Sequence, residues 1–193
     1  MAELQPVPAA TVVLARQAAT DVEVLLLQRN ANLAFNGGKW VFPGGRIDRS
    51  DYPQNSNLEF PAACQAAIRE TREEAGIEIC IEDLIHTAHW TTPPSLPRRF
   101  STWFFVCALR KSVEVEVDRG EIMAHRWITP TQALQECAAK TLRLPHPTQV
   151  TLQDLAPFRK LDDLLSNLAQ ADIRVFPEQS PYYRPEEMGF FRT

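Results

Sequence analysis

The short charged segment Arg69-Glu-Thr-Arg-Glu-Glu-Ala-Gly-Ile77 is the most informative part of this 193-residue chain for its fold and function. Side chains three and four positions apart on a helix lie next to one another, so Glu70, Glu73 and Glu74 share one face. Carboxylates this close repel unless a cation compensates them, and Mg²⁺ or Mn²⁺ prefers such oxygen ligands. Arg69 lies four residues before Glu73 and can neutralise part of the charge. The pattern predicts a metal-binding helix face, although taken alone it also fits a solvated acidic face.

The surrounding sequence predicts a mixed arrangement of helices and strands. We expect the charged helix to begin near Pro61 and to end at Gly76, because proline is tolerated in a first turn and glycine commonly follows a last one. Its other face carries small and apolar side chains, namely Cys64, Ile68, Thr71 and Ala75. Strand-like segments occur at 10–17, 22–28, 40–42, 84–91, 100–109, 113–117 and 124–128. Further helical patterns occur at 129–140 and over most of 155–168. This mixed order indicates an α/β or α+β fold.

Length and composition indicate one soluble globular domain spanning 1–193, with a helical C-terminal extension from about residue 144. The net charge of −4 provides no basic surface for nucleic acid or an anionic membrane, and no apolar run is long enough to cross a bilayer. The N-terminus lacks the pattern of a secretory signal. The four cysteines are widely spaced, which favours reduced thiols. We therefore expect a cytoplasmic protein.

The glycine turn Pro43-Gly-Gly45 and the segment Arg69–Ile77 together resemble the signature of the Nudix hydrolase family, Gly-x5-Glu-x7-Arg-Glu-U-x-Glu-Glu-x-Gly-U, where U is aliphatic. The second half departs from this pattern only at Thr71. Residues 98–105 and 144–152 are similar to a branch that contains coenzyme A diphosphatases. The resemblance implies a mixed β-sheet sandwiched between α-helices, with Mg²⁺ or Mn²⁺ bound at the signature loop and helix.

The whole signature spans about 44–77, and its first half departs further from the family pattern. Gly45 lies 24 residues before Arg69, which is more than the pattern allows, and we place the insertion at 46–60. Pro61 stands eight residues before Arg69, where the family has its first glutamate. Three carboxylates could replace that missing group, with the first preferred: Glu59, Asp48 and Asp51.

The resemblance also implies roles for individual residues. The expected metal ligands are Glu70, Glu73 and Glu74, with Glu59 as the added ligand. Glu73 and Arg69 are also expected to be catalytic residues. Glu121 lies just ahead of a predicted strand, where a Nudix loop carboxylate can serve as general base, although a surface acid beside Arg119 is the alternative. Cations that could contact substrate phosphates are Arg46 and Arg99, which we prefer, and Arg29. Gly45 would allow a close approach of the backbone to the substrate.

Two histidines, His86 and His89, could suggest zinc. An odd offset in a strand directs side chains to opposite faces, so we expect structural or surface histidines instead.

The sequence therefore predicts metal-dependent hydrolysis of a diphosphate bond in a nucleoside diphosphate linked to another moiety, with coenzyme A or acyl-CoA first among substrates. The alternative is a non-catalytic Nudix-fold module that binds a nucleotide or regulates another protein. The expected partner is this small molecule, without nucleic acid or membrane, and a homodimer is one possible assembly.

Overall fold

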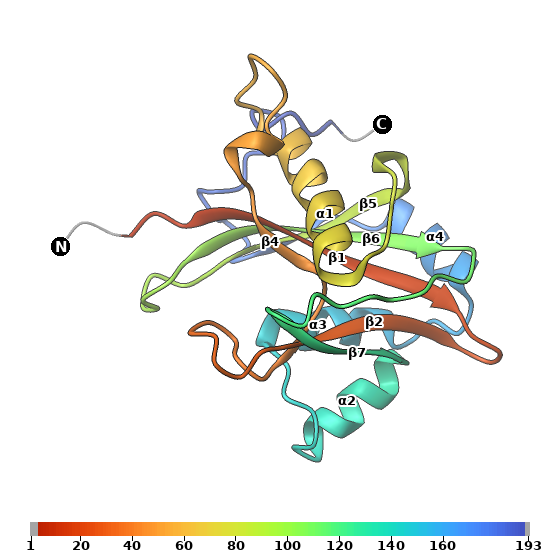
Figure 1. Ribbon diagram of the computed structural model, residues 1–193. Helices are drawn as coiled ribbons and strands as arrows, with labels where there is room; N and C mark the ends of the chain where they lie inside the picture. The colour runs from red at the N-terminus through yellow and green to blue at the C-terminus, as the bar shows by residue number, and fades with distance from the viewer. Residues whose placement is uncertain (1–3, 192–193) are drawn as a thin grey trace.

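A computed structural model describes residues 4–191, which form an eight-stranded mixed sheet with helices on both faces (Figure 1). The sheet order is β3-β2-β1-β6-β5-β8, with β4 paired to β1 and β7 paired to β2. The strands are β1 (Val7–Gln17), β2 (Val22–Arg29), β3 (Trp40–Val41), β4 (Gly44–Arg46), β5 (Leu84–Thr91), β6 (Phe100–Leu109), β7 (Ile122–Ile128) and β8 (Arg174–Phe176). Strand β1 lies parallel to β6 and antiparallel to β2, so it is buried in the middle of the sheet.

The alternation of β1 side chains creates two cores, because successive residues in a strand point to opposite faces. Val12 and Leu14 belong to the core beneath α1, whereas Val13 and Ala15 belong to the core on the other side. That second core is covered by the remaining helices. The helices are α1 (Glu59–Ala75), α2 (Pro130–Ala138), α3 (His146–Leu155) and α4 (Leu161–Gln170), with short 3₁₀ turns η1 (Arg49–Asp51) and η2 (Ile81–Asp83). The predicted mixed sheet between helices is confirmed.

Helix α1 has the two faces that the sequence predicted. Cys64, Thr71 and Ala75 are buried against the sheet. The Thr71 hydroxyl, at the aliphatic position of the signature, donates to the Ala67 carbonyl at 2.7 Å, so its burial leaves no unsatisfied donor. Gly76 ends the helix in the left-handed conformation, with φ of 67°.

The N-terminal end of α1 differs from the prediction, because the helix begins at Glu59 rather than near Pro61. Leu58 provides no side-chain cap for the helix. Instead, the backbone N–H of Phe60 donates to the carbonyl of Met188 at 2.9 Å. A C-terminal segment therefore satisfies one of the free N–H groups of the first turn, a contact that local sequence cannot reveal.

Two other predictions near the sheet edges were wrong or incomplete. Residues 113–117 form no strand, because Val113, Val115 and Val117 pack irregularly on the core beneath α1 while the Glu116 N–H donates to the Ala75 carbonyl at 2.9 Å. The C-terminal region is not wholly helical either, because β8 adds a short strand parallel to β5.

Candidate active site

The glycine turn of β4 fits closely against α1. The Gly44 N–H donates to Glu74 Oε2 at 2.9 Å, which ties the helix carboxylate to the turn. A Cβ atom added at Gly45 would overlap the Glu70 carboxylate, and one added at Gly44 would overlap the Ala10 carbonyl oxygen. Both glycines are therefore required by close approach, and the one at Gly45 leaves space for a signature glutamate.

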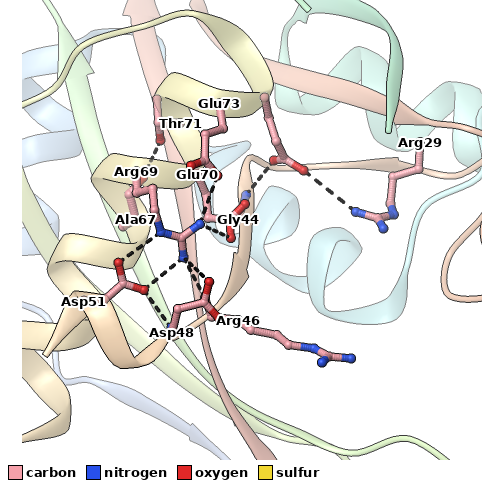
Figure 2. A network of polar contacts seen from close by, with 11 residues as sticks. Arg29, Gly44, Arg46, Asp48, Asp51, Ala67, Arg69, Glu70, Thr71 and Glu73 are labelled. Carbon is pink, nitrogen blue, oxygen red and sulfur yellow. Dashed lines mark hydrogen bonds and ion pairs between the residues drawn. The ribbon is translucent and has the colours of Figure 1, made fainter. Parts of the chain in front are cut away.

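Arg69 lies between the helix carboxylates and the segment that follows β4 (Figure 2). Its Nη1 donates to Glu70 at 2.8 Å and to Glu73 at 3.0 Å. Its Nε and Nη2 donate to the two carboxylate oxygens of Asp51 at 3.0 and 2.9 Å, and Nη2 also reaches the Arg46 carbonyl at 3.0 Å. These bonds, with Asp51 first, raise the pKa of Arg69. Arg69 is therefore a fixed bridge and not a free cation for substrate.

Arg29, at the end of β2, joins the helix to the loop before β7. Its guanidinium is hydrogen-bonded to the Glu121 carboxylate and lies 3.8 Å from Glu74 Oε1. Its Nε donates to the Phe35 carbonyl at 3.3 Å. Through Arg29, the structure brings Glu121 near the helix glutamate Glu74 and leaves the Glu121 side chain half exposed.

The electrostatics of the carboxylates follow from their burial. Burial raises the pKa of Glu74 to about 8, against the lowering effect of the Gly44 N–H and Arg29. Burial also raises the pKa of Glu70, and its bond to Arg69 opposes the change. Glu73 is half exposed. The site therefore holds buried carboxylates whose charge is only partly compensated, which favours a further cation.

The donor set fits Mg²⁺ or Mn²⁺, because Glu70, Glu73, Glu74 and Glu121 offer only carboxylate oxygens. Within residues 4–191, no three His, Cys, Asp or Glu side chains already converge at metal-binding positions. Two arginines, Arg29 and Arg69, hold these carboxylates instead. Binding of an ion would therefore require these arginine contacts to rearrange.

Glu59 is not brought to this group. It begins α1, eleven residues before Glu70, and a helical rise of about 1.5 Å per residue separates the two by roughly 16 Å. Its Oε1 accepts a hydrogen bond from Trp103 Nε1 at 2.8 Å. Burial raises its pKa. In this structure the Glu59 carboxylate is therefore a hydrogen-bond acceptor for the tryptophan of β6.

The predicted phosphate contacts Arg46 and Arg99 have different surroundings. The exposed Arg46 side chain extends away from Arg69 (Figure 2). Arg99 is only 5% exposed, and its guanidinium donates to the carbonyls of Thr92 at 3.0 Å and Leu4 at 2.6 Å. The structure thus leaves Arg46 accessible and fixes Arg99 against backbone.

Asp51 is the residue that the sequence analysis ranked too low. It is 6% exposed and forms both bonds to the Arg69 guanidinium described above. The signal was available, because Asp51 stands six residues after Gly45, the spacing that the signature gives between its glycine and its first glutamate. The same position measured from Arg69 falls on Pro61, close to Glu59, because extra residues separate Gly45 from Arg69.

The histidine prediction was wrong in its geometry. A register shift in β5 between His86 and Ala88 places both rings on the side of Trp103, at centroid distances of 4.9 and 5.3 Å. His86 Nε2 contacts the Tyr183 hydroxyl at 3.0 Å, and His89 Nε2 contacts Ser101 Oγ at 3.1 Å. The bulge adds one residue to the alternation, which is why an odd offset leaves both side chains on one face. They are structural histidines, as expected.

Comparison with known proteins identifies the family. The family model of the NUDIX domain matches residues 5–149, so this chain belongs to the Nudix family. A Caenorhabditis elegans protein named as a nudix hydrolase is 25% identical over 189 residues, covering 80% of this chain and 62% of its own length. The acyl-coenzyme A diphosphatase NUDT19 of Xenopus laevis is 24% identical over 266 residues, covering 90% of this chain and 70% of its own. The chain thus spans less than two thirds of the first of these relatives.

Solved structures support the same fold. A NUDIX hydrolase from Alicyclobacillus acidocaldarius superimposes with a TM-score of 0.75 at 24% identity, covering 86% of this chain and 97% of that one. The NUDIX domain of Shewanella oneidensis NrtR, complexed with ADP ribose, gives a TM-score of 0.59 at 16% identity, covering 78% and 86%. Within residues 4–191, no helix has both the length and the apolar character needed to cross a membrane.

Proposed function

We propose that this protein is a Mg²⁺- or Mn²⁺-dependent diphosphatase acting on a nucleoside diphosphate linked to another moiety, with coenzyme A or acyl-CoA first among substrates. The observation that carries the proposal is the meeting of the α1 glutamates with Glu121 from a separate loop, joined through Arg29. Membership of the Nudix family and the acyl-coenzyme A diphosphatase name of one relative support the reaction and the first substrate.

Glu70, Glu73 and Glu74 would hold the metal. When bound, the ion supplies positive charge for the diphosphate and lowers the pKa of an attacking water. The half-exposed Glu121 would accept a proton from that water, and its contact with Arg29, which also lies near Glu74, supports this role.

Substrate binding would use the other side of the glycine turn. Arg46 offers an exposed guanidinium next to Gly45, whose missing side chain leaves room for the Glu70 carboxylate. Arg29 provides a second positive charge, beside Glu74 and Glu121. Both groups would orient the anionic substrate, since guanidinium groups match phosphate geometry.

The test measures phosphate or nucleotide release from CoA, ADP-ribose, NADH and dinucleoside polyphosphates with Mg²⁺ or Mn²⁺. We expect turnover of at least one of these substrates, with CoA as the preferred one. Inactivity on the whole panel, together with no metal binding in titration, would establish the alternative of a non-catalytic binding module.

A substitution then tests the metal assignment. Glu73→Gln should reduce turnover by at least about 10–100-fold, the effect typical of outer-shell partners of a metal, because a proposed ligand is lost. Its half-exposed position predicts an intact fold. Glu78→Gln, which removes an exposed carboxylate beyond the helix, is the matched control. Equal rates for Glu73→Gln and wild type would refute the role of this helix face.

A further inference from the structure

The loop before β7 is closed by Asp118, a carboxylate that lies outside the proposed metal-binding and substrate-binding groups. Its Oδ2 accepts a hydrogen bond from the Glu121 backbone N–H at 2.9 Å, and its Oδ1 accepts one from the Ile122 backbone N–H at 2.8 Å. A short acidic side chain that accepts from N–H groups further along the chain stabilises a compact turn. The two bonds therefore fix the backbone at the residue whose carboxylate contacts Arg29.

The other side of this loop is tied to the end of β2 through Asn30, the residue that follows Arg29. The Asn30 backbone N–H donates to the Glu121 carbonyl at 2.8 Å, and its Nδ2 donates to the Gly120 carbonyl at 2.9 Å. The Arg29 guanidinium contacts the Glu121 carboxylate itself. Two consecutive residues thus hold both the backbone and the side chain of Glu121.

A β-bulge sets the position of Glu121 relative to the sheet. The register of β7 against β2 shifts at Arg29, which pairs with Ile122, so that Met123 is an extra residue in β7. Ile122 is fully buried in the core beneath α1, whereas Met123 is 48% exposed. Bulges redirect the side chains beside them. Ile122 therefore anchors the chain directly after Glu121, and the turn at Asp118 restrains it directly before.

We propose that Asp118 is a positioning residue for Glu121, holding the turn that places the Glu121 carboxylate against Arg29 without itself contacting metal or substrate. The inference rests on the proposed function, in which Glu121 accepts a proton from the attacking water. A general base must lie within hydrogen-bond reach of the proton that it removes, and a displacement of about 1 Å can lower a rate by about 100-fold. Because the Glu121 side chain is half exposed, the bonds to its backbone restrain it where packing does not.

Three substitutions separate this role from a general loss of stability. Asp118→Ala removes both accepted bonds, whereas Asp118→Asn keeps one oxygen acceptor and should have an intermediate effect. Thr129→Ala is the matched control, because it removes another side-chain cap at the opposite end of β7. That cap is the 3.2 Å bond that the Thr129 hydroxyl accepts from the Gln132 N–H.

The first measurement is the Arg29 Nε–H resonance in nuclear magnetic resonance spectra of the metal-free full chain, identified by its loss in Arg29→Lys. Glu121→Gln should move this resonance, because it removes the charge that faces the guanidinium. We expect Asp118→Ala to move it in the same direction, Asp118→Asn to move it less, and Thr129→Ala to leave it in place.

Three results of this measurement would overturn the inference. One is a folded Asp118→Ala chain with the wild-type resonance while Glu121→Gln moves it; if Asp118→Ala does not fold, the same reading is taken from Asp118→Asn. Another is unfolding of both Asp118 variants, because Asp118 would then be a residue of the fold. The third is an unmoved resonance in Glu121→Gln, because the contact with Arg29 would then be absent in solution.

The second measurement is turnover on the panel substrate. Loss of a general base lowers a rate by about 100-fold or more, so Glu121→Gln sets the limit. Asp118→Ala should lower kcat by about tenfold or more while KM stays unchanged. In a chain that already carries Glu121→Gln, the same substitution should lower kcat by less than about twofold.

Equal losses of kcat in the two backgrounds would contradict the positioning role, because Asp118 would then act independently of Glu121. Wild-type inactivity on every panel substrate would refute the proposed function instead. The Arg29 resonance would still decide whether Asp118 positions Glu121, because that measurement requires neither metal nor substrate.

Discussion

Glu74→Gln should stabilise the metal-free protein, and only at high pH. The side chain is 7% exposed, and burial raises its pKa to about 8 from an ordinary value of 4.5. Between these pH values the folded chain retains a proton that the unfolded chain has released. Stability of the wild type therefore falls as pH rises through this window, and below pH 4.5 the carboxyl group imposes no such penalty.

The magnitude follows from the two pKa values. Each tenfold change in proton affinity corresponds to about 1.4 kcal/mol, which gives an upper limit of ~5 kcal/mol above pH 8. Side-chain relaxation reduces this limit, and we expect roughly 2–3 kcal/mol in practice. For a chain of this length, 1 kcal/mol changes Tm by about 2–4 °C, so Glu74→Gln should raise Tm by roughly 5–10 °C. A glutamine carbonyl can still accept the Gly44 hydrogen bond.

The assay is thermal unfolding followed by circular dichroism in the presence of a chelator, at pH values from about 5 to about 9. The Tm of wild type and Glu74→Gln should agree near the acidic end and separate as pH rises. Glu73→Gln controls for the loss of a neighbouring carboxylate that is half exposed. A Tm difference that is independent of pH would refute the argument, because burial of a charge would not be its cause.

Two further substitutions or modifications test the close packing of the structure. Gly45→Ala should leave the fold intact but weaken Mn²⁺ binding by about 10-fold or more, because the new methyl group displaces the Glu70 carboxylate. Unchanged Mn²⁺ binding would contradict the observed contact. Among the cysteines, the exposed Cys80 should react first with iodoacetamide. Cys64 and Cys107 should react only on unfolding, because burial raises the pKa of each thiol to about 12. Mass spectrometry of partly labelled protein checks this order.

The parts of the fold that the sequence predicted well are those with repeated local patterns. The predicted strands 84–91 and 100–109 coincide with β5 and β6. The small-residue face of α1 and its end at Gly76 also agree with the structure. These features depend on alternation, helical spacing and glycine conformation, all of which are encoded within a few residues.

The parts that failed depend on contacts between distant segments. Alternating valines at 113–117 indicate a strand, but no strand within residues 4–191 pairs with them, and the valines pack on the core beneath α1 instead. The bulge at His86 could not be inferred from alternation, because it adds a residue to the count. Asp51 was hidden by the insertion, since distance along the chain from Arg69 no longer measured distance in space.

The three helix glutamates lie close together on α1, yet the groups that compensate their negative charges differ. Glu73 is half exposed and shares Arg69, and Glu70 is pinned by the same guanidinium at 2.8 Å. Glu74 has one backbone N–H and an arginine no closer than 3.8 Å, so it has the weakest compensation and the deepest burial. A metal requires its carboxylate ligands to be deprotonated. The carboxylate whose charge destabilises the metal-free chain at high pH is therefore the one that an ion bound at the proposed site would stabilise most.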